Sequence, residues 1–562
     1  MSRWCLRICT GLTIVWVLLL GVAQPERSLA SPFGLPQLAS IAVPVEAERA
    51  TVFADQSTVD TRLTPADFVR SIGPGRHQTL THSLVPQAVL DRIKAAALVN
   101  PFAPRDDFAR PSYDLFGGPL TPSPLVKFPG LVDLDGIEPP DMAIASSPSW
   151  VVQGANDHFS VFNRSGVVQI GWPKSFAGFF HVPSPGSCDP MPFMSDPRAF
   201  YISTDQRFVI AALQVDGPII STTCAPLSKY WIAVSQTNNP NGKWNVYAFN
   251  MLQAPGNVAD FTQIGFDANG IYFSGNMYSS SSGFYQHATI FGAPKAKMEA
   301  GMSVIANGFT NLKAGGLLVD TVQPSIELTQ PSTGTPQPVE YFINSKNILN
   351  CTAICRGVTV WSFANVLGSP TLTAANIATK TYSMPPAAKQ PSGTINTDDQ
   401  RISGTPVFEA GLISFGLTTA VKNSTTTVAG IFWGQVKPTL SGTTITGGSV
   451  FQSGYVSFTG NRSAYYPAIA TDSRGNVYMA FGSSSSTLDA SGYYAGRKTT
   501  DALGTIEPAV KLGSGTAVYP FKRWGDYSAA AIDGNTATSD AWFGVEFAVP
   551  SNWATEVGAT RF

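Results

Sequence analysis

The sequence predicts an all-β fold, and two features carry that prediction. The 562-residue chain has 13% charged residues, against about 25% in a typical domain, and it is rich in Gly (51) and Pro (42). From about residue 130 onward, apolar strand-like runs alternate with short turns, and no convincing amphipathic helix separates them. Hydrophobic residues make up 44% of the chain, which is too many for a disordered protein, so the strands are expected to bury a core.

The turns between these runs share one chemistry. Three of them open with Asn163, Asp267 or Asp472 and carry Gly three residues later, and a variant near Asp205 lacks Gly. The side-chain oxygen can accept backbone N–H bonds while Gly takes a positive φ, which closes a hairpin between two strands. Repeated hairpins predict a β-propeller, and at roughly 50 to 70 residues per sheet six or seven blades would fit. A set of stacked β-sandwiches is the alternative.

Residues 1–30 predict a secretory signal peptide. Arg3 and Arg7 provide a basic start, the apolar run Ile8–Ala23 follows, and small residues allow cleavage after Ala23 or Ala30. A retained anchor is the alternative, but the run is short for the roughly 20 residues that a membrane span needs. We therefore expect a secreted or periplasmic protein with no membrane span once the signal is removed.

The region that follows, residues 31–125, predicts a leader or linker rich in Pro and Ala. It shows no strong strand alternation, and its one helix-like stretch is Pro86–Val99, with apolar residues at helical spacing. The propeller domain is expected to span residues 126–562.

The cysteines and the charge balance limit the partners. The net charge is −1 and no run of like charges occurs, so we expect neither nucleic acid nor an anionic membrane surface as a partner. In an oxidising compartment the remaining cysteines predict two disulfides, most simply Cys188–Cys224 and Cys351–Cys355, although three pairings exist. A zinc site at Cys351 and Cys355 is the alternative, but no second ligand pair supports it. We expect a monomer.

Several motifs after residue 130 have an unusual composition. They are Glu138–Ala145, Ser195–Tyr201, Ile232–Trp244, Val360–Phe363, Asp399–Ile402 and Arg523–Ser528. In content and order they resemble a family of secreted bacterial β-propeller proteins with a sialidase-like fold. Arg523–Ser528 is the most specific of them, whereas a Gly of the family pattern is missing at Ala145-Ser146. The resemblance implies a propeller and export, and it implies little chemistry because this fold hosts many functions.

The run Arg523–Ser528 is also the first candidate catalytic site. Arg523, Asp526 and Tyr527 lie on a turn that Gly525 allows, where they would line a propeller mouth. Arg523 would clamp a carboxylate or phosphate, and Asp526 would act as an acid, a base or a calcium ligand. In the structural alternative Asp526 accepts backbone N–H bonds, Arg523 pairs with it, and Trp524 packs between blades.

Scattered charged residues extend this candidate site. Arg401 and Asp399 join the catalytic candidates, and Arg198, Asp141 and Arg497 are candidates for substrate binding. A sialidase-like reaction would need three Arg around the substrate carboxylate, a Tyr nucleophile and an Asp acid, and the chain holds enough of each. The alternative for the pair Asp399 and Arg401 is a salt-bridged loop.

The sequence predicts no metal site and no cofactor, although calcium could bind on the Asp- and Asn-rich turns. His158, beside Asp157, would serve as a base, although a lone His in a blade is more often structural.

We expect a secreted propeller that recognises an extracellular glycan. The sequence leaves open whether it is an enzyme, which would then be a glycoside hydrolase or a related polysaccharide-active enzyme. The alternative is a non-catalytic adhesion or protein-interaction propeller that binds a surface protein. Convergence of Asp and Arg, with at least one carboxylate of perturbed pKa, would favour catalysis. An open face rich in aromatic residues, without a buried acid pair, would favour binding.

Overall fold

The computed structural model describes residues 40–63, 84–99, 103, 120–183, 192–216, 225–328, 339–351, 354–423, 426–535 and 537–562. The predicted signal peptide, Cys188 and Cys224 lie outside these residues. Within them, no helix is long and apolar enough to cross a membrane.

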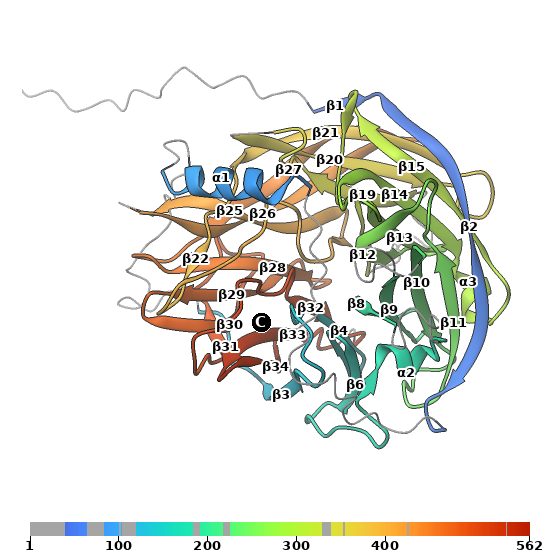
Figure 1. The fold of residues 1–562 in the computed structure, drawn as a ribbon, viewed down its shortest axis with the longest axis horizontal. Helices are drawn as coiled ribbons and strands as arrows, with labels where there is room; N and C mark the ends of the chain where they lie inside the picture. The colour runs from blue at the N-terminus through green and yellow to red at the C-terminus, as the bar shows by residue number, and fades with distance from the viewer. Residues whose placement is uncertain are drawn as a thin grey trace, which may run out of the picture. The chain divides into compact units, whose positions relative to one another are not determined.

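Most strands belong to antiparallel sheets formed by successive stretches of chain (Figure 1). The first sheets are β4 (Met142–Ser146), β5 (Trp150–Ala155), β6 (His158–Asn163) and β7 (Lys174–Ser175); β8 (Met194–Ile202), β9 (Arg207–Asp216), β10 (Leu227–Ser235) and β11 (Lys243–Asn250); and β12 (Asn257–Phe266), β13 (Gly270–Ser279), β14 (Tyr285–Pro294) and β15 (Ile305–Ala314). They are followed by β17 (Gln323–Pro324), β19 (Val339–Ser345), β20 (Cys355–Ala364) and β21 (Thr371–Tyr382); β24 (Val407–Glu409), β25 (Leu412–Asn423), β26 (Thr426–Ser441) and β27 (Thr444–Val456); and β28 (Ser463–Thr471), β29 (Val477–Ser485), β30 (Leu488–Arg497) and β31 (Val510–Gly513). The short strands are β16 (Leu317–Leu318), β18 (Ile326–Glu327), β22 (Ala388–Lys389) and β23 (Thr394–Ile395).

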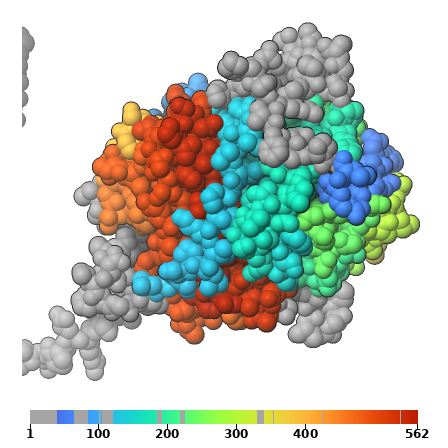
Figure 2. Space-filling view, turned by 90° about the horizontal axis from the view of Figure 1, so that it is seen from below, coloured from blue at the N-terminus to red at the C-terminus, as the bar shows by residue number. Residues whose placement is uncertain are grey.

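The last sheet closes the ring. It consists of β32 (Ala529–Ile532), β33 (Ala541–Val549), β34 (Asn552–Thr560) and the much earlier β3 (Val126–Val132), which pairs antiparallel with β34. Figure 2 shows the same junction on the surface, where early residues lie among C-terminal ones. The first strands contact one another in sequence from β4 to β17 and from β24 to β32, and β32 contacts β4. Between these two series, β18, which follows β17, pairs with β24. Radial sheets joined in this way are a β-propeller, so the predicted all-β propeller is confirmed.

Strand β2 (Val45–Asp60) binds two of these sheets together. Its first half pairs with β15 and its second half with β11, whereas β1 (Ile41–Val43) pairs with β21. In Figure 1, β2 is the blue ribbon along the outside of the green sheets. These residues lie in the range that the sequence assigned to a leader or linker. Most of the strand is exposed, which explains why it lacks the apolar alternation of a half-buried strand.

In the part of the chain that the structure describes, three short helices accompany the sheets: α1 (Gln87–Ala97), α2 (Phe176–Phe180) and α3 (Lys295–Glu299). Helix α1 confirms the helix expected within residues 86–99. Its Leu90 and Ala97 are buried in a cluster with Tyr278. Its Lys94 donates hydrogen bonds to the Pro385 carbonyl and to the Thr397 hydroxyl.

The predicted turns form as expected, with one difference. Asp267 Oδ1 accepts the N–H groups of Asn269 and Gly270, both at 2.7 Å, and Asn163 and Asp472 play the same role in their own turns. Unlike Gly in the other two turns, Gly270 does not have a positive φ. A Cβ there would lie 2.6 Å from the Tyr272 ring, so the close ring explains this glycine.

The predicted disulfide between Cys351 and Cys355 is present, so these two thiols do not hold zinc. It lies at the start of β20.

Candidate functional site

A left-handed backbone residue recurs at or before the first strand of successive sheets. These residues are Asp141, Asp196, Phe261, Thr321, Asp398 and Tyr466, with φ between 28° and 55°. In β8, β12 and β28 the residue lies in a break of the strand register, which identifies a β-bulge. Bulges re-aim side chains and are common next to active sites. The bends bring charged groups of different sheets together. We call this group the axial cluster, and its members are Asp141, Asp196, Arg198, Asp398, Asp399, Arg401, Arg523, Asp526 and Tyr527.

The first part of the axial cluster joins Asp141 and Asp526. Asp141 accepts one hydrogen bond from the backbone N–H of Asp526 and another, at 3.0 Å, from Asn156 Nδ2. Arg523 Nη2 donates to Asp526 Oδ2 at 2.6 Å. Burial, together with the charges of Asp526 and Asp196, raises the pKa of Asp141 well above its usual value. This carboxyl group is therefore held neutral above the pH at which an exposed Asp ionises.

The second part stacks Arg198 on Tyr527. The guanidinium carbon lies 3.3 Å from the centroid of the Tyr527 ring, and Arg198 Nε donates to the Thr262 carbonyl at 3.3 Å. The Tyr527 hydroxyl donates to the Pro197 carbonyl at 3.2 Å. Nearby Asp196 accepts the Thr262 N–H, and burial, followed by the charges of other acids, raises the pKa of Asp196 to about 7.

The third part surrounds Arg401. This residue donates two hydrogen bonds to Asp399, at 2.9 and 2.7 Å, and its Nη2 lies 3.1 Å from Asp398 Oδ2. Burial raises the pKa of Asp398 to about 6. Burial also acts on Asp399, but the charge and hydrogen bonds of Arg401 outweigh it and hold the pKa of Asp399 below its usual value. Two adjacent carboxyl groups thus titrate in different ranges.

Helix α1 adds a cation to the same cluster. Burial lowers the pKa of Lys94 to about 8, and the charges of Asp398 and Asp399 oppose this effect. Sequence reasoning missed Lys94 because it lies in the presumed leader or linker range.

The structure brings together nearly all the predicted site residues: Asp141, Arg198, Asp399, Arg401, Arg523, Asp526 and Tyr527. Arg497 lies elsewhere. It is buried in β30 and donates to the Asp501 carbonyl at 2.8 Å, and burial lowers its pKa. Sequence reasoning did not select Asp398, although it selected the adjacent Asp399 together with Arg401.

The sequence offers two interpretations of the run at residues 523–528. The ion pair of Arg523 with Asp526 and the fully buried Trp524 match the structural one. Asp526 also donates its backbone N–H to Asp141, and its charge acts on Asp196 and Asp398, so it lies among other acidic groups; its predicted chemical role stays a prediction.

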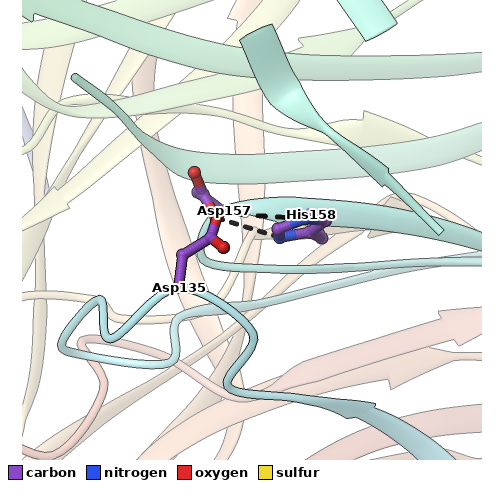
Figure 3. Close-up of side chains that lie close together, drawn as sticks. All are labelled: Asp135, Asp157 and His158. Atoms are coloured by element: carbon purple, nitrogen blue, oxygen red, sulfur yellow. Dashed lines mark ion pairs between the residues drawn. The ribbon is translucent and has the colours of Figure 1, made fainter. Parts of the chain in front are cut away.

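A second group of titratable side chains lies between β3 and β6 (Figure 3). His158 Nδ1 lies 2.9 Å from Asp157 Oδ1, and His158 Nε2 lies 3.9 Å from Asp135 Oδ2. Burial, and then the charge of Asp157, raises the pKa of Asp135 to about 7.

A surface groove of 560 Å³ lies beside β2, away from the axial cluster. Its lining includes the side chains Asn250, Gln253, Asn257, Gln286, Thr310 and Asn311. Its acid is Glu48 and its base is His287, whose pKa burial lowers. The groove lacks the pair of carboxyl groups that acid–base hydrolysis uses, so the axial cluster is the better candidate for catalysis.

No known family model and no curated protein matches the chain. Among solved structures it is similar to a Trypanosoma rangeli sialidase in complex with 2,3-difluorosialic acid, at 8% identity and a TM-score of 0.33, over 70% of this chain and 55% of that one. It is also similar to a protein of unknown function from Dyadobacter fermentans (9%, TM-score 0.32, 66% and 95%) and to an exo-β-1,3-galactanase from Clostridium thermocellum (10%, TM-score 0.26, 78% and 100%). The chain thus spans about half the length of the sialidase. The strand pairing alone establishes the propeller.

Proposed function

We propose that this chain is a seven-bladed β-propeller that works outside the cytoplasm, binds an extracellular glycan at the axial cluster and hydrolyses a glycosidic bond there. Seven sets of strands, which begin with β4, β8, β12, β17, β24, β28 and β32, support this blade number. The disulfide Cys351–Cys355 supports an oxidising compartment.

The observation that carries the proposal is the pair of neighbouring carboxyl groups with divergent pKa values. Asp398 has a pKa of about 6 and a side chain that is 20% exposed, so it can hold a proton and give it to a leaving group. Asp399 is held ionised by Arg401. Environments that push two acids apart in this way are typical of acid–base catalysis.

The arginines support binding of an acidic sugar. Arg198, Arg401 and Arg523 all belong to the axial cluster, and the side chain of Arg523 is 24% exposed. A guanidinium group matches a carboxylate geometrically. We assign Arg523 to contact with the substrate. Asp526 pairs with Arg523 at 2.6 Å, and its charge helps to raise the pKa of Asp398.

The tryptophans argue against a lectin-like face. Among the described residues, Trp150 is partly buried and the other tryptophans are buried, namely Trp172, Trp231, Trp244, Trp361, Trp433, Trp524, Trp542 and Trp553. Side chains packed in the core cannot stack on a sugar ring. This favours the charged cluster over an aromatic surface as the glycan site.

The test is a turnover screen with sialosides, acidic polysaccharides and neutral β-galactans. We expect turnover of an acidic glycan, and a loss of about 100-fold or more in Asp398→Asn and in Asp526→Asn, as removal of an acid–base group causes. Asp55→Asn is the matched control, since its side chain is 83% exposed on β2. Turnover that is equal in all four proteins, or none with any substrate, would contradict the proposal.

A second candidate function is non-catalytic glycan binding at the groove beside β2. Amide and hydroxyl groups line it, as sugar hydroxyls require, and Phe53, which is 65% exposed, offers a ring for stacking. If this candidate holds, Phe53→Ala weakens retention on a glycan column while Asp526→Asn does not.

A further inference from the structure

Two tight turns of the first blade present three possible metal ligands to one another. Asp133 Oδ1 accepts the N–H groups of Asp135 at 3.1 Å and Gly136 at 2.7 Å, which fixes the loop between β3 and β4. In the turn between β5 and β6, the Asp157 carbonyl accepts the Phe176 N–H at 2.8 Å. Both turns are therefore held by backbone hydrogen bonds, so their side chains start from defined positions.

The ligand atoms are close enough for one ion. Asp135, Asp157 and His158 each offer one atom, and the three atoms lie within 4.8 Å of one another. Figure 3 shows both carboxyl groups beside the imidazole ring. Ligands about 2.1 Å from a tetrahedral ion lie roughly 3.4 Å apart, so small side-chain rotations suffice to coordinate it.

One carboxyl group of this cluster is deeply buried, and its Oδ2 faces His158 Nε2 at 3.9 Å. Asp135 is only 8% exposed, and its Oδ1 has no hydrogen-bond partner among the described residues. Within the same part of the chain, no Lys or Arg forms an ion pair with Asp135 or Asp157. Among the described residues, His158 is the only basic group within ion-pair distance of these two carboxyl groups. Buried charges are normally paired or bound to a metal, and a divalent cation would balance the buried Asp135 and the partly buried Asp157 together.

We propose that Asp135, Asp157 and His158 bind one divalent transition-metal ion, Zn²⁺ or Mn²⁺. The mixed donor set selects the ion, because imidazole nitrogen suits transition metals and carboxylate oxygen suits Zn²⁺ and Mn²⁺ as well. Calcium fits less well, since it takes six to eight oxygen ligands.

A bound ion would also restrict the movement of the loop that carries Asp141 in the axial cluster. Asn156, which precedes Asp157, donates its N–H to the Pro140 carbonyl at 2.8 Å and its Nδ2 to Asp141 Oδ2 at 3.0 Å. An ion that fixes the turn at Asp157 therefore fixes the loop that carries Asp141. An effect of the metal on catalysis would rest on the proposed function. Metal binding itself does not depend on the proposed function.

The test uses the full chain, treated with a chelator and then dialysed against Zn²⁺ or Mn²⁺ alone, with bound metal measured by mass spectrometry. We expect about one equivalent in the native protein and in the control His287→Gln, whose imidazole lies in β14. Asp135→Asn and His158→Gln should weaken binding by more than the roughly 10- to 100-fold that follows loss of an outer partner of a metal ligand. Binding should also raise the Tm of the native protein but not of the variants.

Two results would overturn the proposal. One is a native protein that retains neither ion, or that binds only Ca²⁺. The other is a folded variant, judged by circular dichroism, that binds the ion as tightly as the native protein does. The two single variants remove different ligands, so failure of one to fold leaves the other decisive. Metal binding without glycan turnover would refute the proposed function and leave this site standing.

Discussion

Asp141 accepts a hydrogen bond from the backbone N–H of Asp526, which lies 385 positions further along the chain. The bond joins the loop before β4 to the segment before β32. It therefore adds a second connection between the start and the end of the ring, beside the pairing of β3 with β34. One side chain connects the candidate site to the stability of the ring.

Replacement of Asp141 should destabilise the fold in a graded way. Asp141→Ala removes the acceptor for Asp526 N–H and for Asn156 Nδ2, and a buried donor left unpaired costs about 1–3 kcal/mol. Asp141→Asn keeps one acceptor oxygen and should cost about half as much. Urea unfolding at pH 6 measures both. An equal loss of unfolding free energy in the two variants would mean that these hydrogen bonds do not stabilise the closed ring.

Tyr527 allows the stacking on Arg198 to be separated from the hydrogen bond to Pro197. Tyr527→Phe keeps the ring under the guanidinium and loses one hydrogen bond, so we expect a loss of about 1 kcal/mol in unfolding free energy. Tyr527→Ala also removes the ring and leaves a cavity, with an expected loss of about 3–5 kcal/mol. Chemical denaturation compares them. A Phe variant as unstable as the Ala variant would show that the hydroxyl, not the ring, matters most.

The local parts of the candidate site could be predicted from sequence because their partners are close in the chain. Arg523 and Asp526 are three positions apart, and Asp399 and Arg401 are two apart. Their contacts need only a turn. The stacking of Arg198 on Tyr527 needs the whole ring to close, and nothing near Arg198 in the sequence indicates its partner.

Arg497 was predicted to belong to the site, and the sequence could not indicate that it lies elsewhere. By residue type it equals Arg198, but its partner is the carbonyl of Asp501, four positions away, and it stays outside the cluster. The fold was more predictable than the site, because the turn at Asp472 uses only local atoms. Convergence depends on the positions of whole blades.

Because several buried carboxyl groups have raised pKa values, we expect the protein to be less stable at pH 8 than at pH 5. Burial raises the pKa of Glu546 to about 8 and that of Asp196 to about 7. Between about pH 4.5 and 8 the folded state keeps protons that the unfolded state has released. These protonated carboxyl groups contribute fully to the folding stability below the pKa of the unfolded state. The contribution is lost as the pH rises through the pKa of the folded state. Thermal melts across this range should show a falling Tm.

Glu546→Gln should flatten this dependence. The Gln amide stays neutral at every pH. The unfolding free energy of the variant should therefore rise relative to that of the native protein as the pH rises, by an amount on the order of 1–4 kcal/mol at pH 8. At pH 5, where the native carboxyl is protonated, the two proteins should be nearly equal. Parallel Tm curves for the two proteins would show that Glu546 titrates normally in the folded state.

The contribution of β2 can be tested at its buried and exposed positions. Val59 is 1% exposed and packs with the cluster that contains Trp244, so Val59→Ala should cost about 1–3 kcal/mol of unfolding free energy. Phe53 lies on the same strand but is 65% exposed, so Phe53→Ala should change the unfolding free energy by less than about 1 kcal/mol. Equilibrium unfolding compares the two variants. If β2 were a dispensable leader, Val59→Ala would behave like Phe53→Ala, whereas a strand that joins β11 to β15 must lose stability at its buried position.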